Sequence, residues 1–421
     1  MMDFTGKIVV NVVRRFAFEE WGGTETVVWN MSKELARLGL VPEIAATRAL
    51  SADPDGARDG IAIRRFDYFY PRFPLSADSV LRLDKKGGDP FSRGLLAHLS
   101  SPRGAALLHC HSMARMAGMT RRAAKRLGIP YALSFHGGHY EVPPEELREM
   151  MRPIRGSLNY GKLLDWLLRG GRALEDCGGI VCVGYSEHLR AREQFPDKPV
   201  AYIPNGTHPE LFDRKPSGSF RAERRIGADA FLILCVSRID YQKNQKILVE
   251  LTARLAATGE DVHLALIGPA TAPDYHAELT ALVAKLGLQN KVTIIPGLPP
   301  GSPELVDAYL SSDLFVLPSL HEPFGIVVLE AWAARLPVLA AKVGGLRHLV
   351  EDGRTGLFFD PRSLEQLEAL TRSAMADRGL GRRLADNARR EVVERYSWDK
   401  TAAQQLDFYA EVLERHHGRK A

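Results

Sequence analysis

Residues 314–330 read LFVLPSLHEPFGIVVLE, and this stretch decides the fold. Its first four residues, Leu314–Leu317, form a short continuous apolar run that is typical of a buried strand. The residues after Pro323 run into a helical segment. A strand that is apolar on both faces and is followed by a helix is the unit of a parallel sheet covered by helices, so the stretch predicts an α/β protein.

The same strand-and-helix unit recurs on both sides of this stretch, in two series. Two such series predict two doubly wound, Rossmann-like domains with parallel sheets. The expected strands of the first series are Lys7–Val13, Glu43–Thr47, Ile61–Phe66, Ala105–Cys110, Tyr131–Phe135, Gly179–Val183 and Val200–Ile203, and those of the second are Phe231–Val236, Val262–Ile267, Lys291–Ile295, Leu314–Leu317 and Pro337–Ala340.

The break between the two series follows Pro204-Asn205-Gly206, because the residues up to Ser219 are rich in Pro and Gly and lack a helical period. We therefore expect domains at 1–205 and 206–395, with a helix at 217–226 opening the second. A periodic helix at 398–416 follows the last strand, and the segment 396–421 is expected to pack back toward the first domain. Parallel sheets bind ligands beyond the carboxyl ends of their strands. With two sheets facing each other, the active site is expected in the cleft between the domains.

Composition bounds the class of protein. The chain has 421 residues, of which 45% are hydrophobic, and a formal net charge of +5. The charge is uneven, since residues 1–205 hold 29 Lys and Arg against 23 Asp and Glu. A basic first half suits a phosphate-bearing acceptor or an anionic membrane surface, and the alternative is a solvated basic face. No nucleic acid is expected as a partner. No signal peptide or membrane span is apparent, so a cytoplasmic location is expected.

Gly22-Gly23-Thr24-Glu25 follows the first strand and opens an apolar-periodic helix at 24–38. Glycines let the backbone approach a ligand closely, and a helix N-terminus favours an anion, so a diphosphate is the expected guest. The alternative is a plain turn that needs a positive φ. The dinucleotide fingerprint GxGxxG is absent from the chain, which argues against a nicotinamide-dependent enzyme.

Arg238 and Lys243 follow the first strand of the second domain. A guanidinium and an ammonium at one strand end can bind the two phosphates of a nucleoside diphosphate. A departing diphosphate gains charge as a glycosidic bond breaks, so fixed cations there would favour the transition state. The alternative is that both are surface cations at the start of a helix.

The most informative residues are Glu322 and Glu330, which are separated by Pro323-Phe324-Gly325-Ile326-Val327-Val328-Leu329. Carboxylates eight residues apart share one face of a helix if the segment between them is helical. Each can accept hydrogen bonds from vicinal hydroxyls, which sugars and riboses offer. The backbone amides of Phe324, Gly325 and Ile326 would lie at a helix N-terminus and could bind hydroxyl oxygens.

Glu322 to Glu330 resembles the E-x7-E motif of the retaining GT-B glycosyltransferases of glycosyltransferase family 4. The resemblance covers nearly the whole chain, because further segments match the family in order. These segments are Gly22–Glu25, Ile203–Gly206, Arg238 with Lys243, Leu317–Ser319, Ala331–Val338, Val343–Gly345 and Asp352–Gly356.

The resemblance implies a role for each site residue. Gly22 and Gly23 would lie against the donor diphosphate, and Arg238 and Lys243 would complete its binding site. Glu330 would bind the ribose and Glu322 the donor sugar near its anomeric centre. The amides of Phe324, Gly325 and Ile326 would bind the outer hydroxyls of the sugar, and His136 would face it. The expected catalytic residues are therefore His136, Arg238, Lys243 and Glu322.

The implied reaction is transfer of a sugar, with retention of configuration, from a nucleotide-diphosphate sugar to a glycan, lipid-linked or small-molecule acceptor. It needs no metal and no cofactor besides the donor. The alternatives are a GT-B nucleotide-sugar epimerase and a non-catalytic sugar-binding homologue. Intact Glu322, Glu330, Arg238, Lys243 and His136 argue against the non-catalytic reading.

Some residues depart from the family or fit other patterns. His348 stands where the family loop carries a glutamate, and Arg335 replaces a small glycine, for which the sequence offers no account. His109 and His111 flank Cys110, and either a structural role or a role facing the cleft is open for them. The four cysteines have no metal spacing and are expected to be buried thiols. Asp53-Pro54-Asp55 resembles a D-x-D metal motif but is expected to be a turn.

The segment 160–172 lies in the basic first half, downstream of Arg148, Arg152 and Arg155. As a helix it would carry an apolar stripe of Leu163, Trp166 and Leu167 with cations at its edges. Trp beside cations suits a membrane interface, so one hypothesis is that this segment docks the acceptor side on an anionic membrane. The alternative is that the stripe packs on the domain's own core.

Overall fold

The computed structural model of the chain describes residues 3–18, 22–101, 103–137, 140, 148 and 150–418. The chain divides into two compact units, each described by itself below. Unit 1 comprises Met1–Asn205 together with Trp398–Ala421, and unit 2 comprises Gly206–Ser397. The sequence also predicts an insertion with its own helix at 137–172, and this segment lies partly outside the described residues.

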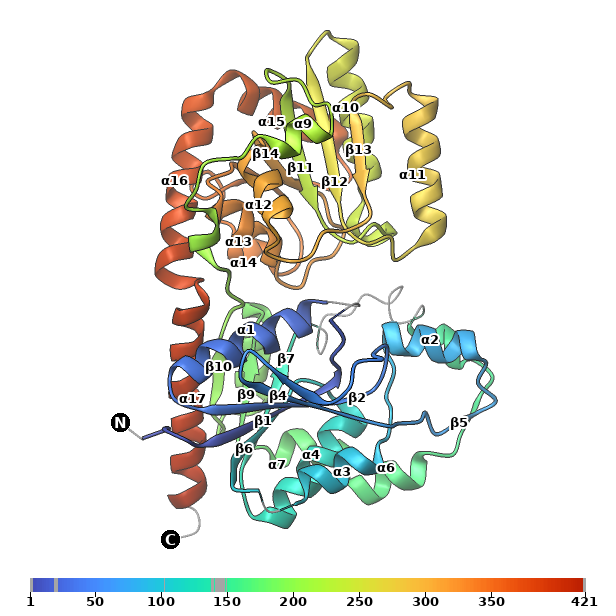
Figure 1. Cartoon of the computed structure of the whole chain (residues 1–421), viewed down its shortest axis with the longest axis vertical. Coiled ribbons are helices and arrows are strands. Elements are labelled where there is room, and N and C mark those ends of the chain that lie inside the picture. The colour runs from blue at the N-terminus through green and yellow to red at the C-terminus, as the bar shows by residue number, and fades with distance from the viewer. Residues whose placement is uncertain are drawn as a thin grey trace. The chain divides into compact units, whose positions relative to one another are not determined.

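Unit 1 is built on an eight-stranded sheet with the strand order β10-β9-β7-β6-β1-β2-β4-β3 (Figure 1). Neighbouring strands are parallel except β3, which pairs antiparallel with β4. The strands are β1 (Ile8–Arg15), β2 (Val41–Thr47), β3 (Gly56–Arg58), β4 (Ile61–Phe66), β6 (Ala105–Cys110), β7 (Tyr131–Phe135), β9 (Gly179–Cys182) and β10 (Val200–Tyr202).

Helices cover both faces of this sheet, so successive residues of β1 lie in different cores. Val12 belongs to the cluster that holds residues of α4, and Val13 belongs to the cluster that holds residues of α1. The helices are α1 (Gly23–Arg37), α2 (Ala77–Lys85), α3 (Arg93–Leu99), α4 (Ala114–Leu127), α6 (Lys162–Leu168), α7 (Ala173–Asp176), α8 (Tyr185–Gln194) and α17 (Trp398–Gly418). A separate two-stranded sheet pairs β5 (Arg72–Phe73) with β8 (Leu158–Asn159).

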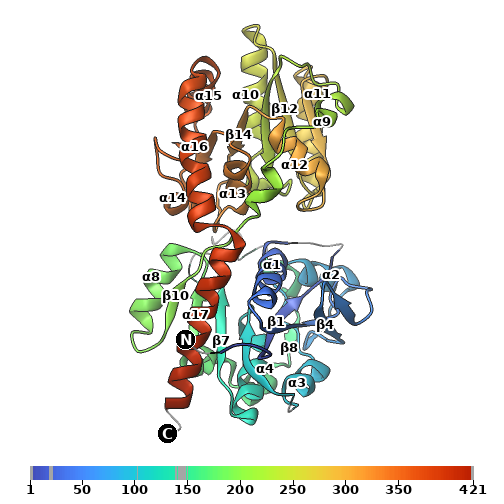
Figure 2. The same cartoon turned by 60° about the vertical axis from the view of Figure 1, so that its left-hand side comes forward.

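Helix α17 belongs to unit 1 although it ends the chain. It packs beside α1, as Figures 1 and 2 both show. Its Phe408, Tyr409 and Val412 are buried. Gly179 of β9 leaves room for them, since a Cβ at this position would lie 2.7 Å from Cζ of Phe408. The helix therefore completes the core over the β9 end of the sheet.

Unit 2 is built on a six-stranded, all-parallel sheet with the order β13-β12-β11-β14-β15-β16. The strands are β11 (Phe231–Val236), β12 (Val262–Ile267), β13 (Val292–Ile295), β14 (Leu314–Leu317), β15 (Val338–Ala341) and β16 (Leu357–Phe359). The helices are α9 (Ser219–Glu223), α10 (Lys246–Ala257), α11 (Pro273–Lys285), α12 (Pro303–Leu310), α13 (Ile326–Ala333), α14 (Leu346–Leu349), α15 (Leu364–Ala376) and α16 (Arg378–Arg395).

Every apolar run that the sequence predicts as a strand is a strand. The strands that the prediction misses are β3, β5, β8 and β16, each of two or three residues and too short to show a period. The helix expected at 217–226 is shorter, because α9 spans only Ser219–Glu223. The GxG of Gly379 and Gly381 lies inside α16.

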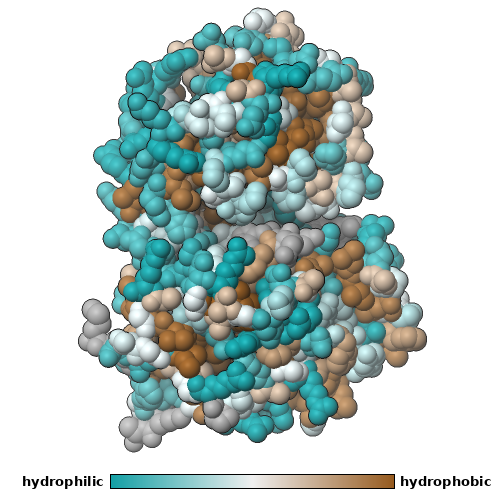
Figure 3. All heavy atoms as spheres, viewed as in Figure 1, coloured by the Kyte–Doolittle hydropathy of each residue, from teal (hydrophilic) through white to brown (hydrophobic). Residues whose placement is uncertain are grey.

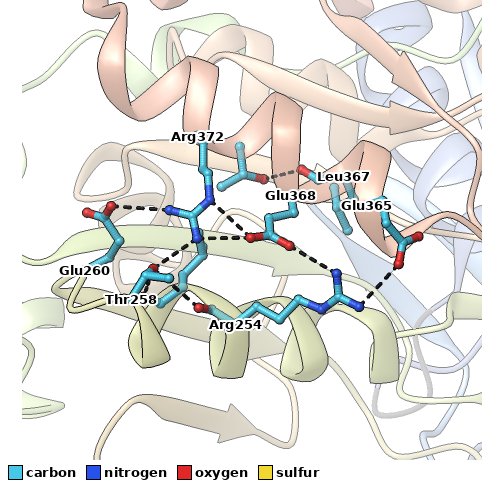
Figure 4. Close-up of polar contacts among 9 residues, drawn as sticks. Arg254, Thr258, Glu260, Glu365, Leu367, Glu368 and Arg372 are labelled. Atoms are coloured by element: carbon cyan, nitrogen blue, oxygen red, sulfur yellow. Dashed lines mark hydrogen bonds and ion pairs between the residues drawn. The ribbon is translucent and has the colours of Figure 1, made fainter.

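A surface ion network joins α10 to α15 in unit 2 (Figure 4). The Arg254 guanidinium pairs with Glu365 and Glu368, in each case at 3.2 Å. Arg372 pairs with Glu368 at 3.0 Å and with Glu260 at 3.3 Å. These side chains are partly or largely exposed, and ion pairs at the surface contribute only about 0–1 kcal/mol each. The network links the two helices but contributes little to the stability of the fold, which comes from the apolar core beneath them.

None of the described helices combines the length and the apolarity that crossing a membrane requires.

Candidate functional site

Lys243 and Glu322 form a buried ion pair at the carboxyl ends of β11 and β14. The Lys243 ammonium donates to Glu322 Oε2 at 2.6 Å, and Ser319 Oγ donates to the same oxygen at 3.3 Å. Lys243 and Glu322 are each only 8% exposed. A buried ion pair of this kind is held in one geometry, because breaking it would leave an uncompensated charge in the protein interior.

A short 3-10 turn, η4 (Tyr241–Lys243), places the lysine. The Asp240 carboxylate precedes the turn and accepts a hydrogen bond from the Lys243 amide at 3.2 Å. Asn244 then takes a left-handed backbone conformation with φ 53°, which turns the chain toward α10. The cation is therefore fixed by backbone geometry at the end of β11.

The loop Val343-Gly344-Gly345 packs directly against the backbone of Glu322 and Pro323. The Gly345 amide donates to the Glu322 carbonyl at 2.8 Å. A Cβ at Gly344 would collide with that carbonyl oxygen, and a Cβ at Gly345 would collide with the Pro323 carbonyl oxygen. The two glycines are required for this close approach, and the loop fixes the backbone that carries Glu322.

Helix α13 begins at Ile326, so Glu322 lies in the loop before the helix and Glu330 lies within it. The condition for a shared helical face is not met, and Glu322 precedes the helix as the sequence predicts. Gly325 precedes the helix with φ 101°, a conformation that glycine adopts readily. The amides of Phe324, Gly325 and Ile326 donate to no described residue and remain available to a ligand.

Arg238 is the more accessible of the two cations. Its guanidinium pairs with Asp240 Oδ2 at 3.1 Å and donates to Gln242 Oε1 at 3.2 Å, and 42% of its side chain is exposed. Arg238 and Lys243 therefore border the same turn, with Asp240 contacting both. The pair can present two positive groups to one anion, and Lys243 is already partly neutralised by Glu322.

Glu330 accepts a hydrogen bond from the Tyr309 hydroxyl at 2.7 Å. Tyr309 is fully buried and stacks on Phe315, so the carboxylate has a rigid partner. Burial raises the pKa of Glu330 to about 7, although the Tyr309 hydrogen bond acts in the opposite direction. At neutral pH the site therefore holds a carboxyl group that is only partly ionised and that a ligand with hydroxyl donors would ionise.

In unit 1, His136 follows β7. His136 Nε2 lies 3.1 Å from His111 Nδ1, and His111 Nε2 lies 3.1 Å from Asn11 Oδ1. The surrounding protein lowers the pKa of His136 to about 4 and that of His111 well below its usual range, so both rings are neutral at pH 7. His109 stays within the core, bonded to Tyr409 and Ser134.

Gly22 and Gly23 lie at the N-terminus of α1. Gly22 precedes the helix with an extended backbone, φ −135°, so the alternative of a turn that needs positive φ is wrong. The constraint at Gly22 is space, because a Cβ there would lie 2.7 Å from Glu25 Oε2. The buried Glu25 carboxylate pairs with Arg15 at 2.9 Å. A carboxylate and an arginine thus already occupy the surroundings of this helix N-terminus.

The outward face of α6 is apolar. Leu163, Trp166 and Leu167 are 65%, 69% and 47% exposed, whereas Leu168 is buried. The alternative that this stripe packs on the domain's own core is therefore wrong. Figure 3 shows hydrophobic and hydrophilic side chains side by side over the α3 and α6 end of unit 1. A groove of about 1070 Å³ lies there, lined by Trp166, Leu167, Leu96, Ala97, Ser100, Ser101 and the cations Arg93, Arg121, Arg122, Lys125, Arg126 and Arg169.

The remaining candidates have structural roles. Asp53-Pro54-Asp55 lies in a loop before β3, where Asp55 accepts from the Arg65 amide at 2.8 Å and Asp53 pairs with the Arg65 guanidinium at 3.4 Å. Among the described residues, no group of three or more His, Cys, Asp or Glu is arranged to hold a metal. The four cysteines are buried thiols. Arg335 follows the C-cap of α13 and has φ 58°, which explains why glycine would suit that position.

Sequence reasoning missed several residues that build the site. Tyr309, Asn11 and Ser32 lie in ordinary helix and strand segments, and no local pattern distinguishes them. Ser319 falls in a segment that matches the family, but the sequence assigned it no role. The sequence did single out His111, which directly follows a strand, and the loop Val343–Gly345, but not the residues that they contact. The partners of these residues are distant in sequence, so only the fold reveals them.

Sequence comparisons place the chain among known proteins. The family described as Glycosyl transferase 4-like domain matches residues 22–206, and the family described as Glycosyl transferases group 1 matches residues 217–391. An uncharacterized glycosyltransferase of Methanocaldococcus jannaschii is 32% identical over 73% of this chain and 76% of that protein. A D-inositol 3-phosphate glycosyltransferase of Xylanimonas cellulosilytica is 29% identical over 94% of both chains.

Solved structures share the fold. Sucrose-phosphate synthase from Thermosynechococcus elongatus superposes with a TM-score of 0.71 and 20% identity, covering 97% of this chain and 100% of that one. HepE from Anabaena, in complex with UDP and glucose, gives a TM-score of 0.70 and 20% identity over 96% and 99%. The chain therefore has the GT-B fold and belongs to the glycosyltransferase family that joins a glycosyl transferase 4-like domain to a glycosyl transferases group 1 domain.

Proposed function

We propose that this enzyme transfers a glycosyl group from a nucleoside diphosphate sugar to a hydroxyl acceptor, with retention of configuration and without a metal. The observation that carries the proposal is the buried Lys243–Glu322 pair beside the available amides at the start of α13. A cation, a carboxylate and free backbone donors at one strand end suit a ligand that carries both phosphate and hydroxyl groups.

Each group has a role in the proposed reaction. Lys243 and Arg238 bind the diphosphate and stabilise the charge that develops on it as the bond between the anomeric carbon and the phosphate oxygen breaks. Glu330 accepts hydrogen bonds from the ribose hydroxyls, and Glu322 and the α13 amides bind the sugar. The acceptor oxygen forms its bond to the anomeric carbon on the face that the phosphate leaves, and its proton passes to the departing phosphate oxygen. Configuration is thereby retained.

Unit 1 supplies the other proposed donor contacts. His136 accepts a hydrogen bond from a hydroxyl of the donor sugar, and Gly22 and Gly23 lie against the diphosphate at the N-terminus of α1. The relative from Xylanimonas acts on an inositol phosphate by its name, and the Anabaena structure holds UDP. These names make a UDP sugar the first donor to test, with a glycan, lipid-linked or small-molecule hydroxyl as acceptor.

The test is nucleotide release in the presence of EDTA. Purified protein is given UDP-glucose, GDP-mannose or ADP-glucose with a panel of sugar and inositol phosphate acceptors. We expect one nucleoside diphosphate to be released, only when an acceptor is present, and the activity to survive the chelator. The reason is that Arg238, Lys243 and helix N-termini meet the charge of the diphosphate.

The outcomes separate the alternatives. Interconversion of the sugar nucleotide without an acceptor would indicate an epimerase, and binding of the nucleotide without any turnover would indicate a non-catalytic homologue. Loss of activity in EDTA with recovery on adding manganese would contradict metal independence. A product with inverted configuration at the anomeric carbon, measured by NMR, would contradict the front-face reaction.

We further propose that the α3–α4–α6 groove and the outward face of α6 contact an anionic membrane. Trp166, Leu163 and Leu167 are exposed beside the six cations of the groove. Of these cations, only Arg121 and Lys125 form an ion pair with a described residue, in both cases Asp176. Aromatic rings sit among lipid headgroups, and each Lys or Arg near an anionic surface adds about 1 kcal/mol. Such a contact would place a lipid-linked acceptor close to the enzyme.

Vesicle co-sedimentation tests the membrane contact. At low salt the protein should bind phosphatidylglycerol vesicles and not phosphatidylcholine vesicles. Replacing Arg93, Arg122, Arg126 and Arg169 with Gln should lower the binding by up to about a thousandfold, because four cations at about 1 kcal/mol each contribute about 4 kcal/mol together. The charge-matched control replaces four exposed arginines of α16 in unit 2, namely Arg378, Arg382, Arg383 and Arg390. Equal loss in both variants, or equal binding to both vesicles, would contradict a specific contact.

A further inference from the structure

A chain of hydrogen bonds links the helix α1 to His136 through three parallel neighbours of the unit 1 sheet. Asn11 lies in β1, His111 directly follows β6, and His136 directly follows β7. Asn11 Nδ2 donates to Ser32 Oγ at 3.2 Å, His111 Nε2 lies 3.1 Å from Asn11 Oδ1, and His136 Nε2 lies 3.1 Å from His111 Nδ1. Asn11 is the one polar residue in the otherwise apolar middle of β1, and it is buried.

The chain has a direction because each neutral imidazole has one donor and one acceptor nitrogen. The side-chain NH2 group of Asn11 donates to Ser32, so the other side-chain atom, Oδ1, faces His111 and must accept a hydrogen bond from it. His111 therefore carries its proton on Nε2, and its Nδ1 accepts. The donor to that Nδ1 is Nε2 of His136, which leaves Nδ1 of His136 with a lone pair. No described residue is hydrogen bonded to this Nδ1.

The surroundings hold the chain in place. The His109 ring lies 4.2 Å from the His111 ring, centroid to centroid, and is itself fixed by Tyr409 and Ser134, each at 2.7 Å. The His111 backbone amide donates to Val12 at 2.9 Å. Burial keeps the pKa values of all three histidines low, so the rings stay neutral at physiological pH and the direction of the chain persists.

We propose that His111, directed by Asn11, is a positioning residue that fixes His136 as the Nε2–H tautomer and so presents its Nδ1 as a hydrogen-bond acceptor. The acceptor nitrogen would receive a hydroxyl group of the donor sugar. If the His136 ring exchanged between its two tautomers, Nδ1 would be an acceptor in only one of them. In the other tautomer Nδ1 would carry the proton and could not accept from the hydroxyl. This consequence for the sugar rests on the proposed function, whereas the tautomer itself does not.

The first measurement needs no substitution. Ring 15N spectra of the full chain with labelled histidine distinguish the Nδ1–H and Nε2–H tautomers, and the signals lost in the His136→Gln variant assign His136. We expect His136 to be neutral at pH 7 with its proton on Nε2. A proton on Nδ1, or an average over two tautomers, would overturn the proposal even if the protein proves to be a transferase.

Variants then test the relay. Asn11→Leu removes the acceptor that directs His111, and His111→Phe removes the bond to His136. In the first variant we expect the His136 ring to show both tautomers. In both variants kcat with UDP-glucose should fall about tenfold, the rate equivalent of one oriented hydrogen bond, while the Kd for UDP, which lacks the sugar, stays within about twofold.

The matched control is Tyr409→Phe. It removes one of the two hydrogen bonds that fix His109, whose ring Ser134 still holds, and it removes no bond of the Asn11–His111–His136 chain. This variant should keep the wild-type tautomer and kcat despite a similar loss of stability. Unchanged His136 spectra and kcat in Asn11→Leu and His111→Phe would contradict the relay. If the wild type does not consume UDP-glucose, the donor is wrong, and the spectra still decide the tautomer.

Discussion

Replacing Lys243 with methionine is expected to lower kcat by about 10²–10³, the effect of removing one fixed group that stabilises charge in a transition state. The same change leaves the Glu322 carboxylate buried beside Ser319 without its cation. Removing one partner of a buried ion pair costs about 3–5 kcal/mol, so the free energy of unfolding should fall by that amount. Urea titration and steady-state kinetics measure the two effects separately.

A double variant separates stability from catalysis. Lys243→Met combined with Glu322→Gln removes both charges, so it should recover most of the lost stability and none of the activity. The matched control is Lys246→Met, because Lys246 is close in sequence but its side chain is 60% exposed. That control should change neither property by more than a small amount. A Lys243→Met enzyme with normal kcat and only a raised KM would show that the lysine does not act on the departing diphosphate.

Glu330→Gln is expected to make the protein more stable and a poorer binder of nucleotide. Burial raises the pKa of Glu330 from 4.5 to about 7, so the folded protein resists ionising this carboxyl group. Below pH 4.5 the group is neutral in both states and costs nothing. As pH rises from 4.5 to about 7 the unfolded chain ionises first, and the wild type loses up to about 3 kcal/mol of stability. Above pH 7 the loss is constant.

The glutamine variant has no carboxyl group and escapes this loss. Its unfolding free energy should exceed that of the wild type by up to about 3 kcal/mol at pH 8 and match it near pH 4. Gln can still accept from the Tyr309 hydroxyl, so packing is preserved. Thermal unfolding at several pH values checks the result. Equal pH dependence in the two proteins would show that Glu330 is not the group responsible.

Nucleotide binding should change in the opposite direction. An ionised carboxylate that accepts ribose hydroxyls contributes about 1.5–3 kcal/mol, so Glu330→Gln should weaken UDP binding about 10- to 100-fold at pH 8. The wild type should bind UDP more tightly as pH rises through 7, and the variant should show only the titration of the nucleotide itself. Calorimetry measures both. Glu322→Gln is the contrasting change, expected to impair transfer while UDP binding persists.

Local sequence patterns predicted most strands and helices of this molecule correctly. Apolar runs such as Phe231–Val236 and Val262–Ile267 are strands with the predicted bounds, because strands buried on both faces are continuous in hydrophobicity. The same patterns predicted the helix at the end of the chain. They missed β16 because three residues carry no period. They overextended α9 at both ends, since the helix begins at Ser219 and only Arg224 and Arg225 continue it, as a turn.

The contacts of the site residues could not be predicted in the same way. Lys243 and Glu322 are 79 residues apart and meet only because β11 and β14 are neighbours in the sheet. The backbone conformation of Arg335 and the outward direction of Trp166 depend on how each helix ends and packs, which residue identity alone does not encode. Motif resemblance supplied the roles of the glutamates, and the fold supplied Tyr309 and Ser319 as their partners.

The position of α17 has a consequence for how the chain is made. Residues 398–418 are translated after unit 2, yet they pack into the core of unit 1, whose strands are translated before unit 2. Until they emerge, the surface of β9 around Gly179 lacks the side chains of Phe408 and Val412 that cover it. The core of unit 1 therefore cannot be completed until the whole of unit 2 has been synthesised. During that interval its apolar surface is open to chaperones, whereas unit 2 can already fold.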